Sequence, residues 1–192
     1  MFNAKYKFPL SIYLVFENTT PIVYTSETLT PNHYICFINP KWFYSINLFL
    51  KKDLFFNLST LIELSAIDLF KYSGTFLKNI MHSKSTRLLV HSSYYFYLTK
   101  LRLTLFFPSA ANTTTTLSLD KIFKNSNWLE REASEMFGVS FKNKYDSRTL
   151  LLDYSKKEHP LLKTFPCEGN FELYYDFIDQ NLYYSNVKSV EL

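Results

Sequence analysis

Residues 100–106 carry the pattern that most limits the fold, because leucine alternates there with polar side chains. A period of two is that of a strand with one buried face. Residues 87–97 are rich in β-branched and aromatic side chains, and we expect them to pair with this strand as a hairpin. Residues 33–38 are typical of a further short strand, and part of 58–70 favours a strand over a helix. The sequence therefore predicts a β-sheet.

Residues 41–52 are expected to form a helix that flanks this sheet. Asn39 can cap the helix, and Pro40 suits its first position, where a missing N–H group costs no hydrogen bond. The helical period places large apolar side chains on one face, which we expect to be buried. This face consists of Trp42, Ile46, Phe49 and Leu50.

A second helix is predicted over Trp128–Phe137. Ser126 or Asn127 can cap its start, and Gly138 follows its end, where a left-handed residue often terminates a helix. A shorter helix, capped by its first residue, is expected over 118–124. Together these elements predict an α+β fold with a mixed sheet and flanking helices.

Residues 139–176 differ from the rest, because they show no sustained period of two or 3.6 and contain Pro160, Pro166 and Gly169. Structureless stretches of this length are uncommon inside compact domains and usually have a function. Their isolated apolar residues argue against disorder, since apolar groups along an extended chain can dock on a partner. These residues are Leu150, Leu151, Leu161, Phe165 and Phe171. We therefore expect an extended C-terminal docking arm.

The composition excludes several classes of site. The chain has three glycines against 15 tyrosines and 19 phenylalanines, so glycine-rich phosphate loops and collagen-like folds are excluded. Two cysteines, Cys36 and Cys167, are too few for a disulfide framework or a multi-cysteine metal site. His159 follows Asp153 and Glu158 at a spacing that fits no established metal-ligand pattern, and no nucleophile–base arrangement is recognisable. We expect neither a metal site nor a catalytic residue.

The net charge of +4 is modest, and it lies outside residues 128–176, which carry seven basic and nine acidic side chains. Lysine makes up 17 of the 21 basic residues, a bias typical of an A+T-rich, organelle-type gene. No segment reaches the ~20 consecutive apolar residues that span a bilayer. The start resembles neither a signal peptide nor a transit peptide. We therefore expect a protein without a membrane span.

Four motifs follow one another between residues 128 and 166. They are Trp128-Leu-Glu-Arg-Glu-Ala-Ser-Glu-Met-Phe-Gly138, Asp146-Ser-Arg148, Leu151-Leu-Asp-Tyr154 and His159-Pro-Leu-Leu-Lys163-Thr-Phe165-Pro166. In this order and spacing the chain resembles the family of NADH dehydrogenase subunit nine, the C chain of bacterial NADH–quinone oxidoreductase, in the peripheral arm of respiratory complex I. The likeness is weaker upstream and extends over residues 32–177.

The resemblance implies a cofactor-free structural subunit of the hydrophilic, quinone-module arm of complex I, which couples electron transfer from NADH to ubiquinone to proton translocation. FMN, iron–sulfur clusters and ubiquinone belong to the complex as a whole. The implied partners are other peripheral-arm subunits, chiefly the large quinone-pocket subunit and its iron–sulfur neighbours, on the matrix side of the mitochondrial inner membrane. The implied partner-binding or structural residues are Trp128, Glu130, Arg131, Glu132, Met136, Phe137, Gly138, Asp146, Arg148, Leu151, Asp153, Tyr154, His159, Pro160, Leu161, Lys163, Phe165 and Pro166.

The chain departs from the family pattern at several positions. Lys144 and Tyr145 stand where the family usually has His-Pro, and Thr149 and Thr164 replace an arginine and an acid. We therefore expect the charge network of the docking arm to differ in detail, most of all around the two threonines.

Glu132 shares a helical face with Trp128 and Met136. A carboxylate between two large apolar groups is costly to bury unpaired, so we expect Glu132 to be buried and paired with Arg148 or with an arginine of the partner. The alternative is that the charged residues of this helix form a solvated face. The family resemblance favours the buried pair.

The domain organisation predicted from these features has four parts. Residues 1–31 form a lineage-specific N-terminal segment, 32–138 the α+β domain, 139–177 the docking arm and 178–192 a C-terminal tail. The alternative function is an RNA-binding organellar ribosomal protein, which the isoelectric point near 8.9 and the many lysines suit. Scattered lysines and an acidic motif region argue against it, and a stand-alone hydrolase is disfavoured because no catalytic arrangement is visible.

Overall fold

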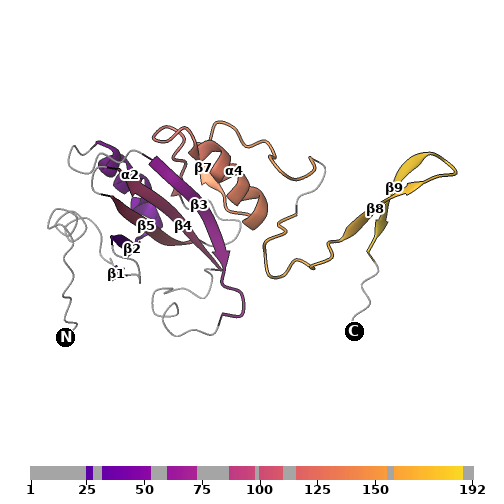
Figure 1. Cartoon of the computed structure of the whole chain (residues 1–192), viewed down its shortest axis with the longest axis horizontal. Coiled ribbons are helices and arrows are strands. Elements are labelled where there is room, and N and C mark those ends of the chain that lie inside the picture. The colour runs from indigo at the N-terminus through magenta and orange to yellow at the C-terminus, as the bar shows by residue number, and fades with distance from the viewer. Residues whose placement is uncertain are drawn as a thin grey trace.

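The computed structural model describes residues 25–27, 32–52, 60–72, 87–97, 100–109, 116–154 and 158–187. Its helices are a 3₁₀ turn, η1 (Pro40–Trp42), and two α-helices, α2 (Phe43–Lys52) and α4 (Ser126–Phe137). Its strands are β1 (Thr25–Glu27), β2 (His33–Phe37), β3 (Thr60–Asp68), β4 (Leu88–Phe96), β5 (Leu101–Ser109), β6 (Thr116–Leu117), β7 (Phe141–Lys142), β8 (Phe171–Asp176) and β9 (Asn181–Asn186). Figure 1 shows a sheet with helices beside it and a separate C-terminal hairpin.

Five strands form the main sheet in the order β1-β2-β5-β4-β3. Strands β2 and β5 are parallel, whereas β1–β2, β5–β4 and β4–β3 are antiparallel, so the predicted mixed sheet is confirmed. Strands β4 and β5 form the predicted hairpin, and β3 confirms the strand expected within 58–70. The pairing of β1 with β2 means that the sheet begins upstream of residue 32, where the α+β domain was expected to start.

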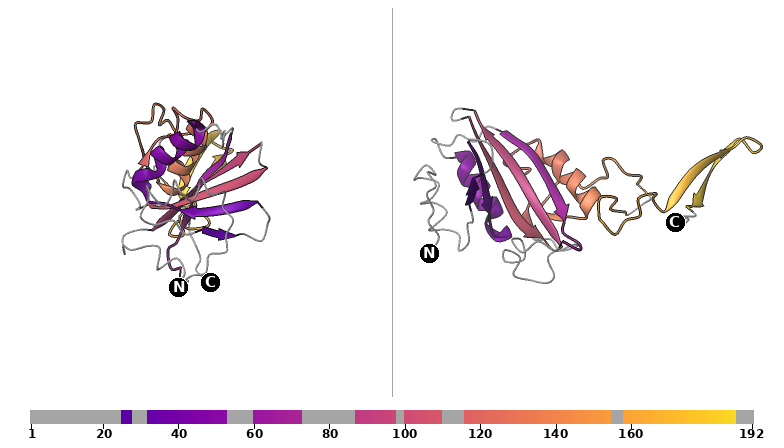
Figure 2. Two further views of the ribbon diagram at one scale, coloured as in Figure 1. Left: turned by 90° about the vertical axis from the view of Figure 1, so that its left-hand side faces the viewer. Right: turned by 60° about the horizontal axis from the view of Figure 1, so that its bottom comes forward.

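A single hydrophobic core joins one face of the sheet to both α-helices. The centre of the sheet contributes side chains that are almost completely shielded from water, including Tyr94, Leu103 and Leu105. Helix α4 adds Ala133 and Phe137. Figure 2 shows α2 and α4 toward opposite ends of the sheet, so each helix covers a different part of it. This arrangement fixes α4 against β3, the edge strand.

The first helix begins as predicted but buries a different face. The Asn39 side chain accepts a hydrogen bond from the backbone N–H of Lys41 at 3.0 Å. The buried residues of α2 are Phe43, Ile46, Asn47 and Leu50. The predicted burial of Trp42 and Phe49 is wrong, since both are exposed. The centroids of the Phe43 and Phe107 rings lie 4.4 Å apart. This contact places Phe43, the residue after Trp42, on the buried face of the helix.

The segment that leads into α4 also differs from expectation. Residues 119–125 form turns, so the short helix predicted over 118–124 is wrong. Asn125, rather than Ser126 or Asn127, occupies the N-cap position of α4, without a side-chain cap hydrogen bond. Gly138 ends the helix in the left-handed conformation, with φ of 74°, as predicted.

The C-terminal part of the chain contains two further pairs of strands. β6 and β7 lie before and after α4 in the chain and pair in parallel. A strand of the expected α+β domain is therefore hydrogen-bonded to a strand of the expected docking arm, across the boundary predicted at 138. β8 and β9 form an antiparallel hairpin that projects away from the main sheet (Figures 1 and 2). The boundary expected at residue 177 falls in the turn of this hairpin, and 181–186 form a strand within the expected tail.

Candidate docking interface

Helix α4 has a buried face and an exposed face. Its buried residues are Ser126, Glu130, Ala133, Glu135 and Phe137. Glu132 is exposed on this chain, so its predicted burial by its own chain is wrong, and its pairing with an arginine of the partner stays a prediction. The alternative of a solvated charged face is also wrong for Glu130, which is fully buried. The helical period allows either face to turn inward, and the contact of α4 with β3 selects the one that carries Glu130.

The buried carboxylate of Glu130 has three donors within the chain. The hydroxyl of Ser118 and the backbone N–H of Leu119 each donate to it at 2.7 Å. The Nζ atom of Lys144 lies 3.2 Å from the same carboxylate. Burial raises the pKa of Glu130 above its ordinary value, although these donors oppose the rise. Glu130 thus ties the turn at 118–119 and the segment after α4 to the helix.

Lys144 supplies the opposite charge from a nearly buried position. Its Nζ atom also donates to the carbonyl of Asn127 at 2.9 Å. Burial lowers the pKa of Lys144, and the neighbouring Glu130 carboxylate opposes this change. Lys144 and Tyr145 stand where the family usually has His-Pro. At this position the chain therefore departs from the family pattern, and the departing residue Lys144 supplies the positive charge that pairs with the buried Glu130.

Arg131 holds the loop that follows. Its guanidinium donates to the carbonyls of Arg148 and Thr149, at 2.8 and 2.9 Å, and lies 3.6 Å from Asp146. Arg148 pairs with Asp146 through two nitrogens, at 3.1 and 2.9 Å. Hydrogen bonds from the side chain and backbone of Arg148 hold the pKa of Asp146 well below its usual range. Asp146 and Arg148 therefore form an ion pair within the chain.

Glu135 binds the backbone of the next segment. Its carboxylate accepts hydrogen bonds from the N–H groups of Leu150 and Leu151, the latter at 2.8 Å, and more distantly from Leu152 at 3.4 Å. Such hydrogen bonds to an ionised acceptor are stronger than those between neutral groups. Glu135 thereby fixes the backbone beside Leu151, whose side chain points outward.

The C-terminal end of α4 is capped by the residues around His159. The Nδ1–H of His159 donates to the carbonyl of Glu135 at 2.7 Å, and the N–H of Leu161 donates to that of Met136 at 3.2 Å. These carbonyls belong to the last turn of the helix, which has no donors of its own for them. A Cβ atom on Gly138 would lie 2.9 Å from Nε2 of His159, so the cap needs glycine there. His159 therefore has a structural role.

Asp68 anchors the far end of the arm to the sheet. Its carboxylate pairs with Arg87 through two hydrogen bonds, at 3.0 and 2.7 Å, and accepts from the N–H of Lys163 at 2.9 Å. Arg87 also donates to the hydroxyl of Thr164 at 3.0 Å. Burial alone would raise the pKa of Asp68, but the hydrogen bonds from Arg87 and from the Phe70 and Lys163 amides outweigh it and lower the pKa.

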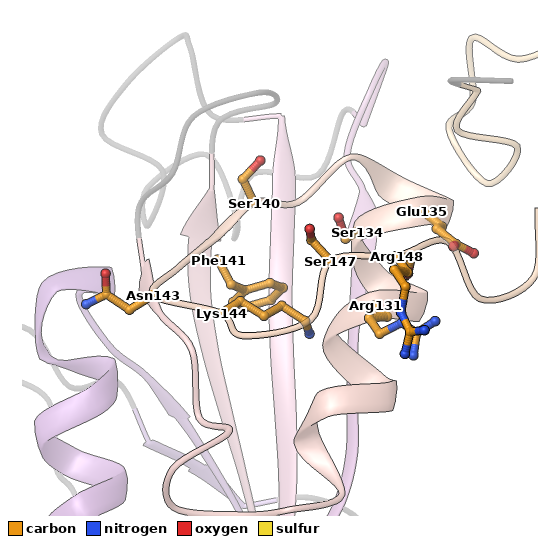
Figure 3. Close-up of a pocket in the computed structure, with 9 residues that line it drawn as sticks. All are labelled: Arg131, Ser134, Glu135, Ser140, Phe141, Asn143, Lys144, Ser147 and Arg148. Atoms are coloured by element: carbon orange, nitrogen blue, oxygen red, sulfur yellow. The ribbon is translucent and has the colours of Figure 1, made fainter. Parts of the chain in front are cut away.

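A pocket of about 350 Å³ lies between α4 and the loop after β7, and Figure 3 draws the residues that line it. Arg131 and Arg148 lie together at one end, and Lys144 extends along Phe141. Asp146 pairs with both arginines, and Glu130 pairs with Lys144. The pocket is therefore bordered by the ion pairs that join α4 to the loop after β7, and each of its three cations has an acidic partner within the chain.

Three large apolar side chains remain outside this network. The exposed fractions of Trp128, Leu151 and Leu161 are 63%, 60% and 55%. Their backbones are fixed by α4 itself, by Glu135 and by the carbonyl of Met136. We call these three residues the apolar platform. Tyr154 is also exposed, and so is Asp153.

The predicted site residues divide into four groups. The structure brings Glu130, Arg131, Gly138, Asp146, Arg148, His159 and the backbone of Lys163 into internal contacts, and it leaves Trp128, Glu132, Leu151, Asp153, Tyr154, Leu161 and Pro166 exposed. Met136, Pro160 and Phe165 are half-buried, and Phe137 belongs to the core. Residues 139–166 thus lie partly on the body of their own chain, and their docking on a partner stays a prediction.

Sequence reasoning missed Asp68, Arg87, Ser118, Glu135 and Lys144 as parts of this site. Glu135 and Ser118 gave no signal of their own, because their partners are backbone groups and a distant carboxylate. Lys144 had one signal, its place within the motif region. The carbonyl of Thr149 and the hydroxyl of Thr164 both accept hydrogen bonds from arginine. That the charge network differs there from that of the family stays a prediction.

Comparison with known families explains why these residues occur together. The family model described as the 30 kDa subunit of respiratory-chain NADH dehydrogenase matches residues 37–171. The chain belongs to this family. It is therefore a complex I subunit, as the motifs predicted, and the ribosomal alternative is not supported.

Relatives from several lineages agree with this assignment. The chain is 36% identical to NADH-ubiquinone oxidoreductase subunit 9 of Paramecium primaurelia over 189 residues, which cover 98% of this chain and 88% of the relative. It is 33% identical to NADH dehydrogenase [ubiquinone] iron-sulfur protein 3 of Patellifolia webbiana, over 72% of this chain and 65% of that protein. The Paramecium match includes nearly all of residues 1–31, which the motifs left unassigned.

Two solved structures share the fold. A trypsin-resistant fragment of Nqo5 superposes with a TM-score of 0.56 at 12% identity, covering 71% of this chain and 96% of the fragment. A chain of the membrane-bound sulfane sulfur reductase, an archaeal respiratory membrane complex, gives 0.61 at 12% identity, covering 82% and 84%. At this level of identity the likeness concerns the fold alone.

Two properties of the described residues bear on cofactors and membranes. Within the seven described ranges, no group of three or more His, Cys, Asp or Glu residues could hold a metal ion. No helix in that part of the chain is long and apolar enough to cross a bilayer. Cys36 is buried in the sheet, whereas Cys167 is exposed.

Proposed function

We propose that the chain is a non-catalytic structural subunit of the peripheral arm of NADH–ubiquinone oxidoreductase, on the matrix side of the mitochondrial inner membrane. It docks on the large quinone-pocket subunit and its iron–sulfur neighbours, and so supports electron transfer from NADH to ubiquinone and the coupled proton translocation. Family membership and the names of the relatives, such as subunit 9 in Paramecium, support this assignment.

The observation that carries the docking role is the apolar platform. Trp128, Leu151 and Leu161 expose most of their side chains, although the Glu135 carboxylate holds the backbone of Leu151 and the Met136 carbonyl holds that of Leu161. Exposed apolar groups on a rigid support mark interaction sites, because a partner can cover them without an entropic cost of ordering the loop. Aromatic side chains such as Trp128 contribute strongly to such interfaces.

We further propose that this chain binds no FMN, iron–sulfur cluster or quinone by itself. An iron–sulfur cluster takes several cysteine thiolates, and the whole chain has two cysteines. One of them, Cys36, is buried, and burial raises the pKa of its thiol to about 12, which disfavours the thiolate that a metal would need.

The non-catalytic assignment is supported by how the buried acids are used. Glu130 and Asp68 accept hydrogen bonds from groups of their own chain, and Glu135 does so along three successive amides. Each of these carboxylates is engaged in holding the fold, which leaves it poorly placed for proton transfer to a substrate.

The docking role is tested by comparing two tryptophans. Trp128→Ala and Trp42→Ala remove the same side chain, from the apolar platform and from the end of η1, and Trp42 is 43% exposed. Each full-length chain is co-expressed with the other peripheral-arm subunits, and the fraction in the complex is measured by native electrophoresis with mass spectrometry of the band.

We expect Trp128→Ala to reduce incorporation about tenfold, as for a central aromatic contact, and Trp42→Ala to leave it unchanged. Equal incorporation of both variants at the wild-type level would reject the apolar platform as the docking surface. A wild-type chain that never migrates with the oxidoreductase would reject the proposed function itself.

A further inference from the structure

The β8–β9 hairpin sorts its side chains onto two unlike faces. Successive residues of a strand point to opposite sides, and the register pairs Leu173 with Tyr184 and Tyr175 with Leu182. We call the resulting row the apolar hairpin face. It consists of Phe171, Leu173, Tyr175, Leu182 and Tyr184, all of them exposed.

The opposite face is polar and makes contacts within the hairpin. The hydroxyl of Ser185 donates to Glu172 at 2.9 Å, and the rings of Tyr174 and Tyr183 lie 5.9 Å apart. Asp176 faces Asn181 at the end of the same side. This face is therefore suited to water, whereas the apolar hairpin face is suited to another protein.

The hairpin also lies apart from the main sheet in the views of Figures 1 and 2. A two-stranded hairpin is at best marginally stable in water without a third strand or a packed face. Five large exposed apolar groups on one side supply such a face. The hairpin thus gains stability when that face is covered.

The charge of the hairpin region limits what can cover it. Residues 166–187 contain four acidic side chains, namely Glu168, Glu172, Asp176 and Asp179, and no lysine or arginine. Glu172 and Asp176 lie on the polar face, whereas Glu168 precedes β8 and Asp179 lies in the turn of the hairpin. Acidic groups at the two ends of an apolar face favour a partner whose apolar patch has basic side chains at its rim. A second copy of the hairpin would place like charges opposite each other, and an anionic lipid surface would repel them.

We propose that the β8–β9 hairpin is a second docking element, and that its apolar face binds a flat apolar surface with a basic rim on another subunit of the same complex. This proposal rests on the proposed function and adds to the apolar platform a separate surface with defined chemistry. It assigns a role to the residues on both sides of the expected boundary at 177.

Neighbouring tyrosines on opposite faces provide a matched test. Tyr175 lies on the apolar hairpin face and is 46% exposed, and Tyr174 lies on the polar face and is 50% exposed. Tyr175→Ser and Tyr174→Ser are introduced singly into the full-length chain, which is co-expressed with the other peripheral-arm subunits. We expect Tyr175→Ser to lower incorporation at least fivefold and Tyr174→Ser to change it less than twofold.

Hydrogen exchange of the hairpin amides identifies the occupant. We expect fast exchange in the free chain and at least tenfold slower exchange in the complex. Slow exchange in the free monomer would mean that the hairpin packs on its own body, and protection that appears only in a homodimer would assign the face to a second copy. Either result would overturn the proposal.

Salt dependence tests the basic rim. Incorporation of the wild-type chain is expected to weaken as ionic strength rises, and the double variant Glu168→Gln, Asp179→Asn is expected to lose at least half of this dependence. If all hairpin variants assemble normally while Trp128→Ala does not, the hairpin proposal fails and the proposed function stands. If the wild-type chain does not join the complex, the proposed function fails first.

Discussion

At the scale of single residues, Gly138 is constrained in two independent ways. Its φ of 74° lies in the left-handed region, and a Cβ atom there would lie 2.9 Å from Nε2 of His159. Gly169 has a similar φ of 78°, but nothing lies within 4 Å of its would-be Cβ. Substitution of Gly169 therefore measures the cost of backbone strain alone, whereas substitution of Gly138 measures the same strain together with a steric contact.

We expect Gly138→Ala to lower the free energy of unfolding by about 2 kcal/mol and Gly169→Ala by about 1 kcal/mol or less. Urea denaturation followed by tryptophan fluorescence measures both. Equal effects of the two substitutions would show that His159 yields to the new methyl group without cost.

Lys144 is the second residue whose replacement has a defined effect. Lys144→Met leaves the buried carboxylate of Glu130 without its counter-charge, which should lower the free energy of unfolding by about 3 kcal/mol at neutral pH. Because burial already raises the pKa of Glu130, its protonation offsets part of this loss, and the deficit should be smaller at pH 5 than at pH 8.

Two further variants test this explanation. Lys142→Met removes an exposed lysine two residues away and should change stability by less than about 0.5 kcal/mol. Adding Glu130→Gln to Lys144→Met removes the unpaired charge and should restore most of the loss. A double variant as unstable as Lys144→Met alone would show that the aliphatic chain of Lys144, and not its charge, matters.

At the scale of elements, the Asp68–Arg87 pair joins the arm to the ends of β3 and β4. The pKa of Asp68 is lowered in the folded chain, so its carboxylate stabilises the fold fully above its unfolded pKa near 3.8. This contribution is lost as the pH falls through the folded pKa, which lies lower. The arm at Lys163 and Thr164 should then loosen from the sheet first.

We expect Asp68→Asn to lower the free energy of unfolding by about 2 kcal/mol at pH 7 and by less at pH 2.5, because below the unfolded pKa near 3.8 the unfolded wild-type chain takes up a proton on this carboxyl. Unfolding curves of both proteins across this range measure the difference. A difference that stays constant down to pH 2.5 would contradict the charged role of Asp68.

Elements also differ in how well their sequences predicted them. The alternation in β5 and the stop signal at Gly138 depend on neighbouring residues only, and both were predicted correctly. The turns at 119–125 replace the helix predicted over 118–124, although the hydroxyl of Ser118 accepts a hydrogen bond from the N–H of Asp120 at 3.2 Å, as a helix cap would. The same hydroxyl donates to Glu130, twelve residues away, so this segment is held by a distant buried acid as well as by its own backbone.

At the scale of the whole molecule, the chain has a packed body and a hairpin that depends on others. Leu105 is fully buried in the central strand β5, and Leu182 is 62% exposed on β9. We expect Leu105→Ala to lower the free energy of unfolding of the isolated chain by about 3 kcal/mol and Leu182→Ala by less than about 0.5 kcal/mol. Urea denaturation measures both, and a large effect of Leu182→Ala would show that the hairpin belongs to the core of its own chain.

The sequence by itself determined four of the five strands of the central sheet, the end of α4 and the family of the chain, because strand alternation, a left-handed glycine and a motif of fixed spacing are local properties, whereas it did not reveal β1. Only the tertiary structure decided which acid of α4 is buried and which segments it joins. The helical period offers more than one face, and the position of β3 selects Glu130 over Glu132. Its partner Lys144 lies fourteen residues away, and such a contact exists only once the chain has folded.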